Sequence, residues 1–160
     1  MRLNPPLRSP RRASGFTMIE VLIAILVLAF GLLGFAFLQT MNVRFTKSAE
    51  QRTVATNLAY ELVDMMRSQR SLGSYYNLIK PASFDDVVVP ASGCARPVSA
   101  TPAANIARWK CEVSAALPDG TANVVLKAEG ALTVEIFWGD DNWSESAKVG
   151  VSTVKVETRL

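Results

Sequence analysis

One carboxylate, Glu20, lies at the start of a long apolar segment and is the first candidate for chemistry in this chain. Residues 21–38 carry no charged side chain, and a run of this length can cross the hydrocarbon core of a bilayer as a helix. A charge in or near lipid costs roughly a few kcal/mol on insertion scales, so such residues usually have a partner and a function. The alternative is a carboxylate that only reaches the membrane interface at the end of an ordinary anchor.

The other polar motifs give little support for catalysis. The chain has no histidine, which excludes a histidine-based triad or general base, and it has neither a P-loop nor a G-x-S-x-G motif. Ser152 and Lys155 match S-x-x-K by letters only, since in a strand their side chains point to opposite faces. Asp140, Asp141 and Asn142 could bind calcium through oxygens, but a hairpin loop explains them better. We therefore expect no enzyme activity, no cofactor and no small-molecule substrate.

The chain contains two cysteines, Cys94 and Cys111, and both follow the apolar segment. If that segment carries them out of the cytoplasm, a disulfide between them is the economical interpretation, because exported domains lie in oxidising surroundings. Two buried free thiols are the alternative. Two cysteines without histidine do not make an ordinary zinc site, so we expect no metal centre.

The positive net charge belongs to the N-terminus. Four arginines precede Gly15 without an accompanying acid, namely Arg2, Arg8, Arg11 and Arg12, and acids balance the basic residues in the rest of the chain. This distribution argues against nucleic-acid binding as an intrinsic activity. By the positive-inside rule, it predicts that the N-terminus is cytoplasmic and that the chain after the apolar segment is translocated.

The elements that position these residues begin with one long helix, predicted over residues 16–71. Its first part, about 16–40, is the membrane segment, and no small-residue cleavage site of a secretory signal follows it. Its second part, 41–71, has the stripe of an amphipathic helix, with Val54, Leu58 and Leu62 at spacings of three and four. We expect Gly73 to end this helix.

Residues 72–160 are predicted to form one globular domain. A partly irregular segment with a short strand at 87–89 leads to a helix at about 102–117, which Thr101 caps and Pro102 begins. We expect Ile106, Trp109, Val113, Ala116 and Leu117 to form the buried face of this helix.

Three strands then follow, where the apolar period changes to two. They are predicted over residues 124–128, 132–138 and 149–158, with a bulge or bend near Ser152 where the apolar phase changes. The fold class is therefore α+β, with the long helix covering one apolar face of a small antiparallel sheet.

The sequence from Gly15 to Glu20, GFTMIE, resembles the class III leader junction of type IV pilins and type II secretion pseudopilins. Residues 1–15 would be the basic leader. The resemblance implies that a prepilin peptidase cuts after Gly15 on the cytoplasmic side and methylates the new amine of Phe16. Glu20 would then pair with such an amine, in the same or a neighbouring subunit, and set the register of assembly. Met18 stands where leucine is commoner, a volume-conserving difference.

Two further stretches narrow the resemblance. Residues 25–39 and 55–67 look like the minor pilins called PilV, or type IV pilus modification proteins, and Trp109 with the strand ending at Trp138 also fits that subfamily. The resemblance implies a non-enzymatic pilus subunit that starts in the bacterial inner membrane and has a periplasmic domain. Its partners would be the prepilin peptidase, other minor pilins and the major pilin.

Two other hypotheses remain open. A pseudopilin of a type II secretion system uses the same anchor helix, and a membrane-anchored binding module would keep its N-terminus uncleaved. Gene neighbourhood or the phenotype of a deletion distinguishes a pseudopilin from a pilin. The N-terminal mass of the protein distinguishes an uncleaved binding module from a processed pilin.

Overall fold

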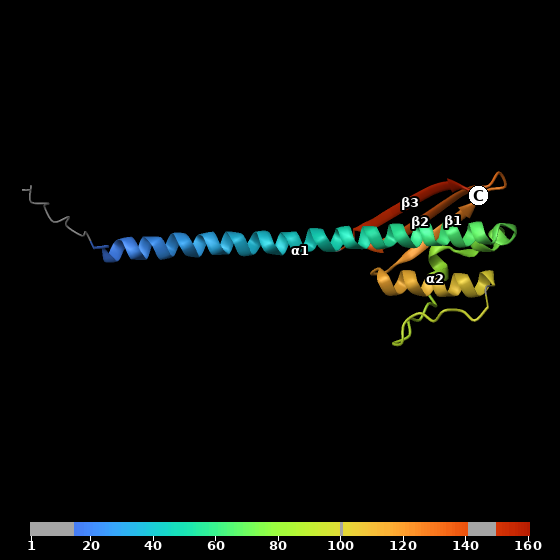
Figure 1. Cartoon of the computed structure of the whole chain (residues 1–160), viewed down its shortest axis with the longest axis horizontal. Coiled ribbons are helices and arrows are strands. Elements are labelled where there is room, and N and C mark those ends of the chain that lie inside the picture. Colours follow the sequence, from blue (N-terminus) through green and yellow to red (C-terminus); the bar gives the residue numbers. More distant parts are fainter. Residues whose placement is uncertain (1–14, 100, 141–149) are drawn as a thin grey trace, which may run out of the picture. The chain divides into compact units, whose positions relative to one another are not determined.

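The computed structural model describes residues 15–99, 101–140 and 150–160, so of the predicted leader it covers only Gly15. The chain divides into two compact units, Met1–Asn42 and Val43–Leu160. Helix α1, Met18–Ser68, runs through both (Figure 1).

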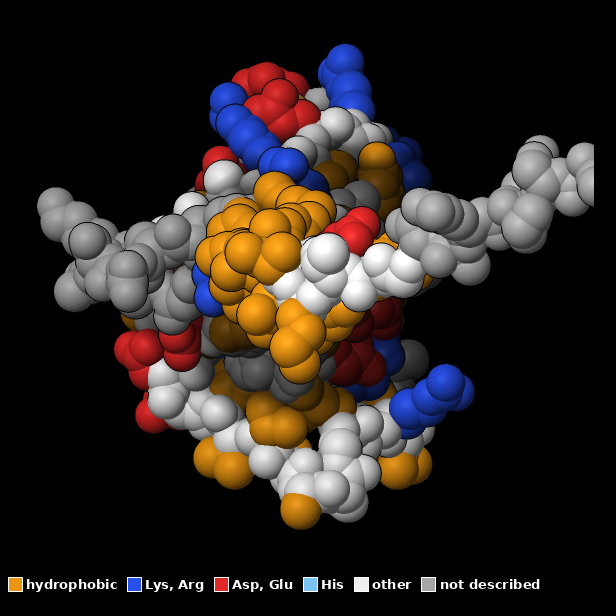
Figure 2. Space-filling model, turned by 90° about the vertical axis from the view of Figure 1, so that its left-hand side faces the viewer, with side chains coloured by type: hydrophobic (Ala, Val, Ile, Leu, Met, Phe, Trp, Pro, Cys, Tyr) orange, Lys and Arg blue, Asp and Glu red, His pale blue; other side chains and the backbone are white. Residues whose placement is uncertain are grey.

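In the first unit, the structure describes the early turns of α1 and residues 15–17 before them. The apolar side chains of this part are exposed, and Figure 2 shows hydrophobic side chains over the near end of the unit. An apolar window of mean hydropathy 3.0, none of it buried, makes α1 long and apolar enough to cross a membrane. Gly31 and Gly34 do not interrupt the helix, although glycine lowers helix propensity by about 1 kcal/mol relative to alanine.

In the second unit, one face of α1 enters the core. Leu58 and Leu62 of the predicted stripe are buried, while Val54 is only partly buried. The spacing of three and four residues places these side chains on one side of the helix, and that side packs with the sheet and with α2. The buried residues of α1 are Gln51, Ala55, Leu58, Ala59, Leu62, Val63 and Met66.

The sheet has three antiparallel strands in the order β1-β2-β3. They are β1 (Thr121–Leu126), β2 (Ala131–Gly139) and β3 (Val151–Arg159). β2 follows the prediction closely: alternate residues Leu132, Val134, Ile136 and Trp138 are buried. The α+β fold class is confirmed, with the long helix packed on a small antiparallel sheet.

Of the bulge or bend predicted near Ser152, the bulge is wrong. β3 pairs with β2 without interruption, from Val151 opposite Gly139 to Arg159 opposite Ala131. Ser152, Val154, Val156 and Thr158 alternate with more exposed residues along β3, so they share one face, and Val151 is left on the exposed face. The sequence argument for a change in the apolar alternation used Val149 together with Val151, and Val149 lies outside the described residues.

Helix α2, Pro102–Ala116, begins as predicted. The side chain of Thr101 accepts a hydrogen bond from the backbone N–H of Ala104, and Pro102 occupies the first turn. Trp109 and Val113 are fully buried, but Ala116 is exposed, contrary to the expected face. Leu117 is buried at the C-cap, where the backbone has already turned to an extended conformation.

Two predictions for the connecting segment are wrong. α1 ends at Ser68, before a 3-10 helix, η1 (Arg70–Leu78). Gly73 lies inside η1 and is buried, and a Cβ there would lie 3.0 Å from Leu126 Cδ2, so close packing explains this glycine. Residues 87–89 follow a second 3-10 helix, η2 (Pro81–Phe84), and do not form a strand. The N–H of Val124 in β1 bonds to the carbonyl of Ile79 instead.

Candidate functional site

The start of α1 is defined by Thr17. Its carbonyl accepts hydrogen bonds from the N–H groups of Glu20 (3.1 Å) and Val21 (3.3 Å), and its hydroxyl oxygen accepts from the Glu20 N–H at 3.4 Å. These bonds identify Thr17 as the N-cap. Gly15 and Phe16 precede the helix and are exposed, so the peptide bond that joins them lies outside it.

Glu20 occupies the first turn of α1. Its side chain borders an open hollow on the helix surface, and it forms no hydrogen bond or ion pair with any residue that the structure describes. The hollow is otherwise lined by apolar groups: Phe16, Val21, Ala24, Ile25 and Leu28. A carboxylate so placed has an apolar surrounding on one side, which favours pairing with a cation that another molecule or a processed terminus supplies.

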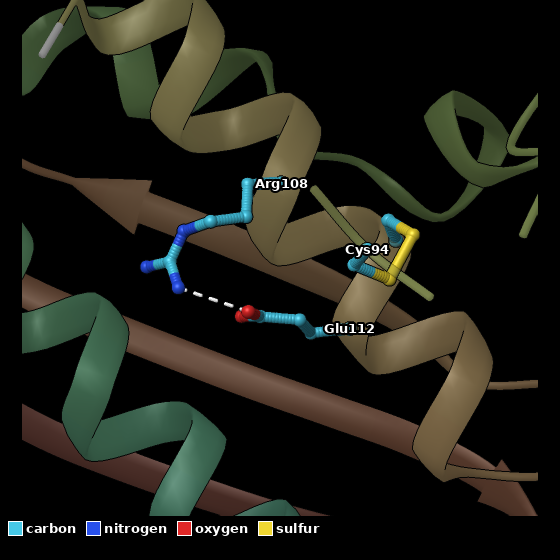
Figure 3. The surroundings of a disulfide bond; sticks show 4 residues. Cys94, Arg108 and Glu112 are labelled. Atoms are coloured by element: carbon cyan, nitrogen blue, oxygen red, sulfur yellow. Dashed lines mark hydrogen bonds and ion pairs between the residues drawn. A yellow bond between two sulfur atoms is a disulfide. The ribbon is translucent and has the colours of Figure 1, made fainter. Parts of the chain in front are cut away.

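The two cysteines form the disulfide Cys94–Cys111, with the two Cα atoms 5.8 Å apart. It joins the irregular segment before α2 to the middle of that helix (Figure 3). Cys111 is almost completely buried. The bond therefore fixes a segment that has no regular hydrogen bonding of its own.

Beside the disulfide, Arg108 of α2 joins two carboxylates, and Figure 3 shows its ion pair with one of them, Glu112. Its guanidinium lies 2.6 Å from Glu61 of α1 and 2.9 Å from Glu112 of α2. Burial raises the pKa of Glu112, the charge of Glu61 raises it further, and Arg108 opposes both effects. Glu112 Oε2 is buried and has no hydrogen-bond partner among the residues that the structure describes. The arrangement links the two helices electrostatically and leaves one carboxylate imperfectly satisfied.

The residues that matched catalytic or metal motifs have structural contacts instead. Ser152 donates a hydrogen bond to Asp140 at 3.3 Å, whereas Lys155 forms an ion pair with Glu157 at 2.8 Å. Asp140 also accepts from Ser48 at 2.7 Å, which ties α1 to the end of β2. The predicted loop residues Asp141 and Asn142 lie outside the described ranges. Within those ranges, no group of three or more potential ligands could hold a metal ion.

Sequence reasoning missed Thr17 and the Arg108 network. In both cases the sequence contains a pattern that could have predicted the contact. Thr17 and Glu20 match the first and last positions of a capping box, S/T-x-x-E, and Arg108 and Glu112 have the i, i+4 spacing of a helical ion pair. The contact with Glu61 could not be read from the sequence, because it depends on how α2 packs on α1.

Residues 10–36 match the family model of the prokaryotic N-terminal methylation motif. Neither the comparison with curated proteins nor that with solved structures found a match. The motif and the α+β fold together resemble those of type IV pilin-like proteins, and the motif implies a class III leader that a prepilin peptidase processes. Pilin-like proteins of this kind are non-enzymatic structural subunits.

Proposed function

We propose that this protein is a minor type IV pilin, most like PilV, that takes part in priming assembly or in forming the tip of the pilus. The observation that carries the proposal is the position of the methylation motif. Residues 10–36 cover the beginning of α1, and the later turns of the same helix form the core of the α+β unit. One helix thus serves both the processed anchor and the folded domain.

The precursor is a single-pass protein of the bacterial inner membrane, with its N-terminus in the cytoplasm. The four arginines before Gly15 support this orientation through the positive-inside rule. Cleavage after Gly15 removes them and gives Phe16 a free amine, which the peptidase then methylates. The mature segment keeps its apolar surface, and it can leave lipid for another apolar environment.

Glu20 is the proposed register charge. In the intact chain, the nitrogen of Phe16 is part of a peptide bond, so the cation that Glu20 needs does not exist before cleavage. After cleavage, a methylated amine within about 4–6 Å favours the ionised carboxylate, and the carboxylate favours the charged amine. An unpaired charge in low dielectric is heavily penalised, so the pair selects the axial position at which a subunit packs.

The proposed partners are the other minor pilins and the major pilin, through the apolar helix. The support for this is the exposed apolar side chains of residues 16–38, which in water would be unfavourable. They suit lipid before assembly and the helices of neighbouring subunits afterwards.

The N-terminal mass of the membrane-extracted protein tests the proposal. A mature chain that starts at methylated Phe16 is the expected result, and an intact Met1 would sink the proposal in favour of an anchored binding module. The phenotype of a gene deletion then distinguishes a type IV pilus from a type II secretion system. Loss of surface pili is expected for a pilin, whereas loss of protein secretion with normal pili would identify a pseudopilin.

A further inference from the structure

We infer that the outer edge of β3 binds an extended segment of a second, non-identical protein, in which apolar and acidic residues alternate. The segment joins the sheet beside β3 as a further strand. The choice of a non-identical partner rests on the proposed function in one respect, namely that all copies of this chain are anchored in one membrane with the same orientation.

β3 is the outer strand of the sheet (Figure 1), and alternate residues direct their backbone groups away from β2. Beyond the end of β3, the N–H of Leu160 bonds to the carbonyl of Gly130 at 2.9 Å. Before its start, the N–H of Asp140 bonds to the carbonyl of Gly150 at 2.9 Å. Hydrogen-bonded pairs recur at every second residue of an antiparallel ladder, so the even-numbered residues of β3 bond to β2 in this uninterrupted register.

The N–H and C=O groups of the odd-numbered residues therefore point outward. No residue that the structure describes bonds to these groups. An unpaired edge of this kind is a template for another strand. The residues concerned are Val151, Thr153, Lys155, Glu157 and Arg159.

The opposite edge of the sheet, formed by β1, is bonded to residues 77–80. The N–H of Val124 donates to the carbonyl of Ile79 at 3.0 Å, and the carbonyl of Val124 accepts from the ammonium of Lys80 at 2.9 Å. The side-chain amide of Asn77 accepts from the N–H of Leu126 at 2.6 Å and donates to its carbonyl at 3.2 Å. The middle of the β1 edge is thus occupied, whereas the β3 edge is open along its length within the described residues.

Within the second unit, α1 and β3 run in the same direction. Near the start of β3, Ser48 of α1 and Ser152 of β3 both bond to Asp140, at 2.7 and 3.3 Å. Near the end of β3, Arg67 of α1 bonds to Thr158 at 3.1 Å. A two-fold antiparallel pairing of two β3 strands would therefore point the two α1 helices in opposite directions, which a common orientation in one membrane does not allow.

The other ways of pairing with a second copy are also unfavourable. A β3 strand cannot add to the β1 edge of another copy, because residues 77–80 bond to that edge. Parallel pairing of two β3 strands would turn one sheet over and set Lys155 and Glu157 beside Val154 and Val156 of the other copy. The partner strand therefore comes from a different protein.

The side chains along the edge define the chemistry of this partner. On the exposed face, Lys155 and Glu157 balance each other at 2.8 Å, and Arg159 adds a positive charge that attracts an acidic residue. On the other face, Val154 and Val156 are partly buried against the core, so apolar neighbours would extend it. Because successive side chains of a strand point to opposite faces, the partner segment alternates apolar and acidic residues.

The test uses the full-length protein in detergent and a synthetic, end-blocked peptide in which valine and glutamate alternate. We expect its Kd to be at least about threefold lower than that of a peptide of alternating valine and lysine. The bound peptide should slow amide hydrogen exchange at Thr153, Lys155 and Glu157, whose N–H groups face the edge, and leave the even-numbered residues unchanged.

Thr153→Pro removes one outward N–H group without removing a hydrogen bond to β2. We expect it to weaken binding of the valine–glutamate peptide about three- to tenfold, whereas Thr153→Val keeps the N–H group and should bind like the wild type. Lys155→Glu changes only an exposed side chain and should abolish the preference for the glutamate peptide. Urea midpoints check the folding of each variant, and Lys155→Glu decides the outcome if Thr153→Pro does not fold.

Absence of peptide binding, or equal binding by folded Thr153→Pro and the wild type, would overturn the inference. Photo-cross-linking from p-benzoylphenylalanine in place of Thr153, in cells that express two differently tagged copies, tests a second copy as the occupant. Cross-links between the two copies would overturn the choice of a non-identical partner. The N-terminal mass decides the proposed function separately: a processed chain that does not bind the peptide refutes only this inference, and an uncleaved chain that binds it refutes only the proposed function.

Discussion

The guanidinium of Arg108 lies 2.6 Å from the carboxylate of Glu61 and so joins α2 to α1. The Arg108 side chain is only 19% exposed, and it also serves Glu112. We predict that Arg108→Met lowers the free energy of unfolding by about 1–3 kcal/mol, because two partly buried carboxylates lose their charged partner. Urea unfolding of the full-length protein in detergent, followed by tryptophan fluorescence, measures the change.

Lys47→Met is the matched control for this prediction. Lys47 pairs with Glu50 at 3.1 Å, but both side chains are more than half exposed, so its loss should cost no more than about 0.5 kcal/mol. An equal effect of the two substitutions would contradict the structural role assigned to Arg108.

The raised pKa of Glu112 predicts a pH dependence with a definite sign. Burial and the nearby charge of Glu61 raise this pKa, and Arg108 and Arg96 oppose the shift. The folded state therefore binds the proton more tightly than the unfolded state, so the contribution to stability is fully present below the ordinary glutamate pKa. It is lost as the pH rises through the raised pKa of the folded protein.

Glu112→Gln should remove this part of the pH dependence. We expect the wild type to lose stability relative to the Gln variant as the pH rises from about 4 to 7. Urea midpoints of both proteins at several pH values give the difference directly, and titrating groups that do not interact with Glu112 cancel in it. If the difference in unfolding free energy between the two proteins stays constant with pH, the raised pKa of Glu112 is refuted.

Local periodicity predicted the regular elements well. β2 buries every second residue from Leu132 to Trp138, and only a half-buried strand has that pattern. The start of α2 was also predictable, since Thr101 and Pro102 are a cap and a first-turn residue whose preference is local.

Features that depend on tertiary neighbours were not predictable. Residues 87–89 have strand-like side chains but do not form a strand, and the N–H of Val124 in β1 bonds with the carbonyl of Ile79. Gly73 looked like a helix stop, whereas its lack of a Cβ admits Leu126. For Gly73, the deciding contact comes from a residue far away in the sequence.

For the candidate site, the sequence indicates the residues but not the partner of Glu20. Gly15, Phe16 and Glu20 were predicted from residue types, spacing and resemblance, and all three lie within residues 10–36, which match the methylation motif. Their roles stay predictions. The partner of Glu20 stays a prediction, because the amine of Phe16 is created only by cleavage. No contact within one intact chain can reveal it.

The disulfide should stabilise the second unit against unfolding. It closes a loop between residues 17 positions apart, and the chain-entropy model gives about 3 kcal/mol for a loop of this length. The double variant Cys94→Ser/Cys111→Ser should therefore unfold at a lower urea concentration, by roughly that free energy. Thiol labelling of the unfolded protein checks the bond itself, with two reactive thiols expected only after reduction. Two thiols in the unreduced protein would show that the bond is absent.

Glu20→Ala should separate processing from assembly. The substitution leaves the apolar segment and the Gly15–Phe16 junction unchanged, so we expect normal insertion, cleavage and N-terminal mass. Incorporation should fall at least about tenfold, since the methylated amine of Phe16 would have no counter-ion in low dielectric, and about 1.4 kcal/mol suffices for that factor. Immunoblots of sheared pili against total membrane protein measure the ratio.

Glu50→Ala is the matched control, because this acid lies on the same helix but is exposed beside Lys47, and its incorporation should be normal. Wild-type amounts of Glu20→Ala in the pili would show that the carboxylate does not set the register.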